Sequence, residues 1–210
     1  MKRTTRTVAL AIALAFISLF VDPALAQPTL KFTGESGPGV GLNVVLIAGD
    51  EEYRSEESCP MLAKILSQRH GFTCTVLSSL DKTGKYIDPN NSYSMPRVSQ
   101  LAKADLMIIG TRFRKLKDED YNYIADFLNA GRPVIGFRTA THAFSGGGKT
   151  GNFAWSQFGL KILGERWISH HGQHKVQGTR GVIYEDNAGH AVLNSVKDVF
   201  GPSDVYGVRH

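Results

Sequence analysis

The chain has 210 residues, of which 42% are hydrophobic and 20% are charged, and its formal net charge is +5. This composition fits one ordinary globular domain with a sizeable core, and it excludes disordered and fibrous chains. Lysine and arginine are scattered along the chain, and the densest run, RFRKLK at 112–117, is not part of a nucleic-acid-binding motif. We therefore expect no nucleic acid partner.

The first 26 residues have the features of a secretory signal peptide. Three basic residues precede an apolar stretch from Val8 to Val21, and the cleavage triplet ALA follows at 24–26. A membrane anchor is the alternative, but the apolar stretch is short for a bilayer span. We expect cleavage near Ala26, export to the periplasm or the extracellular space, and no stable membrane anchor. The segment carries three positive charges and one negative charge, so the mature chain has a net charge of +3.

Apolar strands alternate with helices along the rest of the chain. A leader with glycine and proline occupies 27–41, and continuous apolar runs predict strands at 42–48, 72–77, 105–110 and 133–137. Helices are predicted at 56–71 and 116–131, with a short helix before the third strand. On the first helix, the residues expected to face the core are Met61, Leu62, Ile65 and Leu66. The alternation predicts a doubly wound α/β domain with a mostly parallel sheet over 42–210.

The two cysteines, Cys59 and Cys74, lie at the start of the first helix and on the second strand. In an exported protein such a pair could form a disulfide. We expect two buried, unpaired thiols instead, because these positions fall at opposite ends of a helix-strand unit.

Charged and hydroxyl side chains follow three of the predicted strands. In chain order, the ones we single out are Asp50, Glu51, Tyr53 and Arg54, then Arg112, then Arg138, Thr139 and His142. The carboxyl ends of parallel strands meet at one edge, where ligands bind in such folds. We interpret this rim as a polar pocket for a polyhydroxylated or anionic small molecule. Structural ion pairs that hold the loops are the alternative.

A second polar segment, FGLKILGERWISHHGQH at 158–174, contains Glu165 after the helix-ending Gly164. It also contains three histidines within five residues, namely His170, His171 and His174. Clustered imidazoles can share a metal ion, but Gly172 favours a loop in which these histidines form hydrogen bonds or face a substrate. A divalent metal therefore stays an alternative, and we expect no other cofactor.

Five blocks in order resemble the ThuA-like (trehalose-utilisation) family of the class I glutamine amidotransferase-like superfamily. They are LIAGDEEYRSEESCPMLAKIL, ADLMIIGTRFRKL, AGRPVIGFRTATHAF, FGLKILGERWISHHGQH and GHAVLNSVKDVFGPSDVYGV, and together they span about residues 42–208. The RTATHAF and HHGQH forms are similar to the exported, planctomycete-type branch. The resemblance implies a flavodoxin-like, class I glutamine amidotransferase-like sheet.

The corner after the fourth strand departs from the superfamily. Amidotransferases carry a nucleophilic cysteine at this turn, and ThuA-like relatives commonly carry a histidine, whereas this chain has Arg138. The resemblance therefore implies no cysteine glutaminase activity, with Arg138 as a substrate anchor and His142 as an acid or base. The Gly-x-x-Phe-x-x-His segment of the family matches residues 164–170. The Asp-Glu-x-Tyr motif of the family matches residues 204–206, with Val205 in place of the acidic residue.

Relatives continue beyond that last motif, so the resemblance implies that this chain lacks the C-terminal strands of the family. It also implies carbohydrate metabolism, with a disaccharide or keto-sugar as ligand. We expect acid-base chemistry by an isomerase, lyase or hydrolase, with His142, Glu165 and Arg138 as catalytic residues. The expected substrate-binding residues are Asp50, Glu51, Tyr53, Arg54, Arg112, Thr139, His170 and His171. A non-catalytic sugar-binding or scaffold module and a metal-dependent hydrolase are the alternatives, and a homo-oligomer stays open.

Overall fold

A computed structural model describes residues 29–207 of the chain. The predicted signal peptide and its cleavage site lie outside the described residues. Within 29–207, no helix combines the length and the apolarity that a membrane crossing requires.

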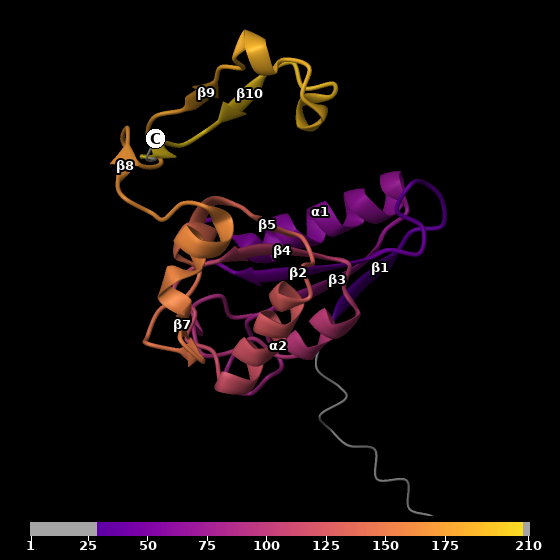
Figure 1. The fold of residues 1–210 in the computed structure, drawn as a ribbon, viewed down its shortest axis with the longest axis vertical. Coiled ribbons are helices and arrows are strands. Elements are labelled where there is room, and N and C mark those ends of the chain that lie inside the picture. Colours follow the sequence, from indigo (N-terminus) through magenta and orange to yellow (C-terminus); the bar gives the residue numbers. More distant parts are fainter. Residues whose placement is uncertain (1–28, 208–210) are drawn as a thin grey trace, which may run out of the picture.

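A five-stranded sheet forms the centre of the fold (Figure 1). Its strands are β1 (Leu30–Thr33), β2 (Asn43–Gly49), β3 (Thr73–Ser78), β4 (Leu106–Thr111) and β5 (Val134–Gly136), in the spatial order β1-β3-β2-β4-β5. From β3 to β5 all neighbours pair in parallel, whereas β1 is antiparallel to β3. The mixed α/β fold with a mostly parallel sheet is confirmed, and the four predicted strands end within one residue of their predicted bounds. β1 is an addition, since it lies inside the leader segment.

The central strand β2 shows why this sheet is covered on both faces. Val44, Leu46 and Ala48 belong to one buried apolar cluster, and Val45 and Ile47 belong to another. Successive side chains of a strand point to opposite faces, so a continuous apolar run requires a layer on each side. The sequence NVVLIAG therefore specifies a buried central strand.

Helices supply the two layers. Helix α1 (Ser55–His70) packs with the first cluster, while α2 (Asp118–Asn129) and the 3₁₀ helix η2 (Val98–Lys103) pack with the second (Figure 1). Three acidic residues stand in the first turn of α2, where the helix dipole favours negative charge. Gly71 ends α1 at a positive φ of 84°, a conformation that costs glycine little.

The buried face of α1 differs from the predicted one. Met61 and Ile65 are 61% and 45% exposed, so their predicted place in the core was wrong. The side chains that face the sheet are the small ones of Cys59, Ala63 and Ser67. Small residues let the helix approach the sheet closely. Leu62 and Leu66 pack against the same cluster and are partly buried, whereas Met61 and Ile65 lie on the outer surface.

Cys59 and Cys74 are both buried, and both are free thiols, which confirms the prediction for the cysteine pair. Burial, together with the negative charges of Glu56 and Asp50, raises the pKa of Cys59 to about 12. A thiol with such a pKa is protonated at neutral pH and behaves as a small apolar side chain.

The chain beyond β5 consists of short elements. They are η3 (Arg138–His142), β6 (Lys149–Thr150), β7 (Phe153–Ala154), η4 (Trp155–Gln157), the π-helix η5 (Gly159–Leu163), β8 (His170–His171), β9 (Thr179–Gly181), η6 (Glu185–Asn187), η7 (Ala191–Leu193), β10 (Val199–Gly201) and β11 (Val205–Tyr206). Strand β8 pairs with β11, and β9 pairs with β10. We call residues 172–204 the C-terminal arm. In Figure 1 the arm stands apart from the sheet, on the same side as α1.

Candidate functional site

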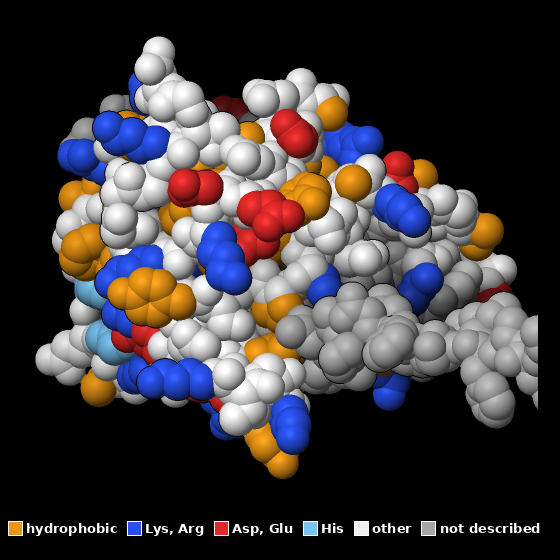
Figure 2. Space-filling model, turned by 90° about the horizontal axis from the view of Figure 1, so that it is seen from below, with side chains coloured by type: hydrophobic (Ala, Val, Ile, Leu, Met, Phe, Trp, Pro, Cys, Tyr) orange, Lys and Arg blue, Asp and Glu red, His pale blue; other side chains and the backbone are white. Residues whose placement is uncertain are grey.

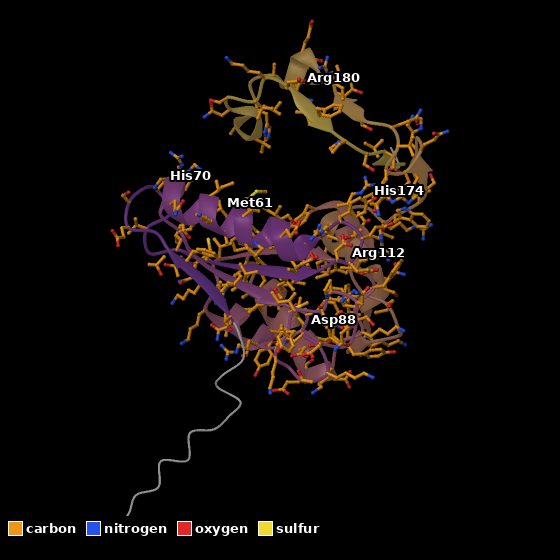
Figure 3. The ribbon with its side chains drawn as sticks, turned by 180° about the vertical axis from the view of Figure 1, so that it is seen from behind. Met61, His70, Asp88, Arg112, His174 and Arg180 are labelled. Atoms are coloured by element: carbon orange, nitrogen blue, oxygen red, sulfur yellow. The ribbon has the colours of Figure 1, made fainter. Side chains whose placement is uncertain are left out.

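The carboxyl ends of β2, β4 and β5 meet at one end of the sheet. Strand β3 lies on one side of β2 and β4 on the other, so the direction of winding reverses at β2. Ligands of open α/β sheets bind at such a reversal. Figure 3 shows Arg112 and His174 at this end of the molecule, whereas His70 lies at the far end of α1.

Ion pairs connect the loops that follow β2 and β4. Glu51 accepts hydrogen bonds from Arg112 and from Arg114, whose Nη2 lies 3.0 Å from Oε2 of Glu51. Nε of Arg112 lies 3.1 Å from Oε2 of Glu52. Arg114 is only 2% exposed and also donates to the backbone carbonyl of Pro89. Glu51 and Arg112, both predicted to bind substrate, are thus paired with each other and hold two loops together.

Asp50 and Thr139 connect the loops that follow β2 and β5. The Thr139 hydroxyl donates to Oδ2 of Asp50 at 2.5 Å, and Oδ1 of Asp50 accepts the backbone N–H groups of Glu52 and Tyr53. Asp50 is 1% exposed and Thr139 is fully buried. In this structure the contacts of these two predicted substrate-binding residues are with the protein itself, and they hold the loops after β2 and β5 together.

Arg54, a further predicted substrate-binding residue, lies on the surface at the start of α1. It precedes α1 with a φ of 55°, its side chain is 67% exposed, and it pairs with Glu56 and Glu57 on the surface of the helix. Its guanidinium is therefore engaged on the surface of α1.

Arg138 occupies the sharp corner after β5, in the left-handed conformation with a φ of 46°. A residue other than glycine is strained there and needs support from its surroundings. The guanidinium is sandwiched between the rings of Tyr53 and Tyr206, whose centroids lie 4.4 and 4.3 Å from Cζ. It donates to the Tyr53 hydroxyl, to the backbone carbonyl of Asp204 at 2.7 Å and to the carboxylate of Asp204 at 2.9 Å. Stacking and hydrogen bonding together hold this corner.

Asp204, at the end of the arm, is the centre of the network. Its side chain is inaccessible to solvent, and its carboxylate accepts hydrogen bonds from Arg138, His170, His174 and Ser203. Burial alone would raise the pKa of this carboxyl, but the hydrogen bonds from these four residues hold it well below its usual range. Asp204 is therefore a fixed negative charge.

The three clustered histidines have three different environments. Nδ1 of His170 bonds to Asp204, and Nε2 of His170 has no hydrogen-bond partner within residues 29–207. Both ring nitrogens of His174 are engaged, Nδ1 with Asp204 and Nε2 with Glu52, each at 3.1 Å. His171 is exposed and follows His170 on β8, so its side chain points to the opposite face of the strand. In Figure 2, histidine side chains reach the surface at one end of the molecule, beside basic and acidic groups.

A group of three possible metal ligands is present, but its members differ from the predicted set. The ligand atoms of His170, His174 and Asp204 all lie within 4.8 Å of one another. Asp204 takes the place that the sequence interpretation gave to His171.

His142 lies beside this network among aromatic rings. Its ring is 4.9 Å from Phe113, 6.0 Å from Trp167 and 5.8 Å from Tyr206, measured between centroids. Nδ1 of His142 lies 3.2 Å from the hydroxyl of Thr141. Burial, with a smaller contribution from the positive charge of Arg112, lowers the pKa of His142 to about 4. The ring is therefore neutral at pH 7.

Trp167 and Tyr206 connect the two histidines. The ring of His170 lies 5.8 Å from Trp167 and 5.3 Å from Tyr206, so both aromatic rings contact both His142 and His170. Glu165, a predicted catalytic residue, comes just before Trp167 and accepts the backbone N–H of Arg166 at 2.8 Å. This bond ties one of its oxygens to the local turn.

Sequence reasoning did not single out Glu52, Asp204 or Tyr206 as site residues. Glu52 could have been found because it stands between two residues that were singled out, in GDEEYR. Asp204 and Tyr206 belong to the motif at 204–206 that supported the family resemblance, but their sequence distance from the rim hid their role.

No family model matches the chain, and comparisons with curated proteins and with solved structures likewise give no match.

Proposed function

We propose that this chain is a ThuA-like protein that carries out acid-base chemistry on a keto-sugar, with His170 as the proton-transfer group. One observation carries the proposal: the buried carboxylate of Asp204 accepts from Nδ1 of His170, while Nε2 has no partner within residues 29–207. A carboxylate on one ring nitrogen fixes the tautomer and the orientation of the imidazole, and it leaves the other nitrogen available as a base.

In the proposed reaction, Nε2 of His170 takes a proton from the carbon next to the sugar carbonyl. The electrons of that C–H bond form a carbon–carbon double bond, and the electrons of the carbonyl double bond move to its oxygen. When His170 returns the proton to the former carbonyl carbon, and a proton passes between the two sugar oxygens, the carbonyl has moved by one carbon. This is an isomerisation without net oxidation.

His142 is suited to support the developing negative charge on oxygen. Its low pKa keeps the ring neutral. If the hydroxyl of Thr141 donates to Nδ1, the proton of the ring is on Nε2, which can donate to the carbonyl oxygen. A neutral imidazole can polarise a carbonyl in this way. Trp167, which is 42% exposed and contacts both histidines, offers an aromatic face on which a sugar ring can pack.

The other polar residues of the rim have supporting roles in this proposal. Arg138 positions Asp204 and Tyr53 rather than anchoring substrate, because its terminal nitrogens are already engaged. Asp50, Thr139, Glu51 and Arg112 hold the three loops in place through the contacts described above.

The family proposal has support from the fold. Numbered from β2, the parallel strands lie in the order 2-1-3-4, which agrees with the flavodoxin-like order as far as it extends. The corner after β5, where the superfamily has its nucleophile, has the sharp left-handed turn at Arg138. Neither free cysteine stands at this corner and both are buried in the core, which supports the absence of glutaminase chemistry. We further propose export and a carbohydrate ligand, as the sequence indicates.

Deuterium exchange tests the proposal even when the product has not been identified. The mature protein is incubated with a panel of keto-sugars in D₂O, and incorporation of deuterium next to the carbonyl is followed by NMR. We expect exchange with the wild type and with His171→Asn, and a loss of at least about 100-fold with His170→Asn. His171 is the matched control because it adjoins His170 but faces away from Asp204. Absence of exchange with every keto-sugar would reject the catalytic proposal and favour a sugar-binding module.

A metal-dependent hydrolase is the second candidate, and the grouping of His170, His174 and Asp204 favours it. These residues would hold a divalent cation, which would supply Lewis-acid activation of a water molecule. The fit is poor in one respect, because Arg138 donates to the same carboxylate and places a positive charge beside the site. Metal analysis of the purified protein, and thermal unfolding with and without a chelator, separate this candidate from the first.

A further inference from the structure

A second feature adjoins the histidine network: an open cleft between the C-terminal arm and the body of the domain. Its volume is about 560 Å³, within the range of roughly 300–1,000 Å³ that small-molecule sites occupy. On the arm side it is lined by Val199, Phe200 and Pro202, and on the body side by Phe137. Phe200 is 64% exposed, so its ring is available for contact with a ligand.

The cleft ends at the network described above. In addition to the apolar residues, Tyr53, Arg138 and Asp204 line the cleft. Two further polar atoms of lining residues, Nε of Arg138 and Oγ of Ser58, are buried and have no hydrogen-bond partner within residues 29–207. A buried donor without a partner is costly, and these two atoms add to the polar character of this end of the cleft.

We propose that this cleft is a subsite for an aromatic aglycone, so that the ligand class is an aryl glycoside rather than a disaccharide. A second sugar ring would need free hydrogen-bonding groups along the wall, but Val199, Phe200 and Pro202 are apolar. The two hydroxyls that the arm adds to the wall already donate within the arm, Thr179 to the backbone carbonyl of Ser203 and Ser203 to Asp204. An aromatic ring buries apolar surface against Phe200 and Pro202, while the sugar lies toward the end of the cleft that Tyr53 and Asp204 line. The inference rests on the proposed function for the position of the sugar, which must lie at His170.

The test compares two glycosides with the same sugar, 4-nitrophenyl glucoside and methyl glucoside, by titration calorimetry on the mature protein. We expect the aryl compound to bind about tenfold more tightly. Phe200→Ala should remove this preference, whereas Tyr184→Ala should keep it. Tyr184 is the matched control because it is an aromatic residue of the same arm, 76% exposed, that does not line the cleft. Circular dichroism checks that both variants fold.

Two results would overturn the inference. Equal affinities for the two glycosides in the wild type, or an aryl preference that survives Phe200→Ala, would show that the cleft does not receive an aglycone. Sedimentation is measured in parallel, and a change of oligomeric state in Phe200→Ala without a change in selectivity would instead identify this face as a contact between two copies of the chain.

The test is independent of catalysis. Aryl selectivity without deuterium exchange on any keto-sugar would support the cleft and reject the proposed function. Deuterium exchange without aryl selectivity would support the proposed function and reject the cleft as an aglycone subsite.

Discussion

Nη2 of Arg138 donates to Oδ1 of Asp204 across a distance of 2.9 Å, although the two residues are 66 positions apart in the chain. Nη1 also bonds to the backbone carbonyl of Asp204, so the guanidinium contacts the residue twice. This contact joins the corner after β5 to the end of the C-terminal arm. The same carboxylate orients His170, so this pair contributes to the position of the proposed base.

Replacing Arg138 with lysine should loosen the arm. Lysine keeps the positive charge but cannot make the two-point contact or the flat stack between two rings. We expect a loss of about 2 kcal/mol in the stabilisation of the arm, seen as faster proteolysis within 172–204. Limited digestion followed by mass spectrometry locates the cuts.

Arg132→Lys is the matched control for this variant. Arg132 donates to the backbone carbonyls of Leu101, Ala102 and Ala104 and makes none of these bonds to the arm. The Arg132→Lys variant should leave the rate of proteolysis within 172–204 unchanged. Equal cutting of the arm in both variants would contradict the proposed role of Arg138.

Asp204 should make stability depend on pH in the acid range. Its pKa in the folded protein lies well below the value of roughly 3.9 for an unfolded aspartate. The stabilisation is therefore present above that value and is lost as the pH falls toward the folded pKa. Urea unfolding at several pH values should show a lower free energy of unfolding at pH 7 for Asp204→Asn than for the wild type. On acidification, the free energy of unfolding should fall less for the variant than for the wild type. Asp198→Asn, which removes an exposed carboxylate, should follow the wild type.

The low pKa of His142 should respond to the charge of Arg112. Burial and this neighbouring charge lower the pKa of His142 to about 4. Because the unfolded value is roughly 6.5, the corresponding stability is complete above that pH and is lost as the pH falls toward 4. Arg112→Gln should raise the pKa in an NMR titration, and Arg112→Lys, which keeps the charge, should leave it close to 4. Identical titration curves for the two variants would rule out the charge of Arg112 as a cause.

The two thiols should be inert in the native protein. Cys59 and Cys74 are buried and free, and burial raises the pKa of both. A thiol reagent should label neither residue until the protein is denatured, and then both without a reductant. Labelling that required a reductant would reveal a disulfide.

The sequence predicted the parallel strands well because their signal is local. A continuous apolar run such as NVVLIAG has few alternatives to a buried strand, and the polar residues after each strand then fall at one edge. The face of α1 that packs against the sheet was harder to predict. Met61 and Ile65 were expected inside on hydrophobicity alone, but the close approach of the helix to the sheet favours Cys59 and Ala63.

The sequence indicated where in the fold the candidate site lies, but not the role of each residue in it. Asp50 and Arg112 were recognised as polar residues of the rim, yet only their three-dimensional partners show that they brace loops. Asp204 was missed because its role comes from contacts with His170, 34 positions earlier, and Arg138, 66 positions earlier. Such long-range pairings leave no periodic signal in a single sequence.

In the proposed mechanism, Asp204 holds His170 with its proton on Nδ1 and with Nε2 free to act as a base. Long-range ¹⁵N–¹H correlation spectra of the histidine rings test it directly, recorded at roughly pH 8, where an ordinary imidazole is neutral. We expect a protonated Nδ1 and an unprotonated Nε2 for His170, with loss of this tautomer preference in Asp204→Asn. A proton on Nε2 of His170, or the same tautomer in the variant, would show that Asp204 does not prepare His170 as the base.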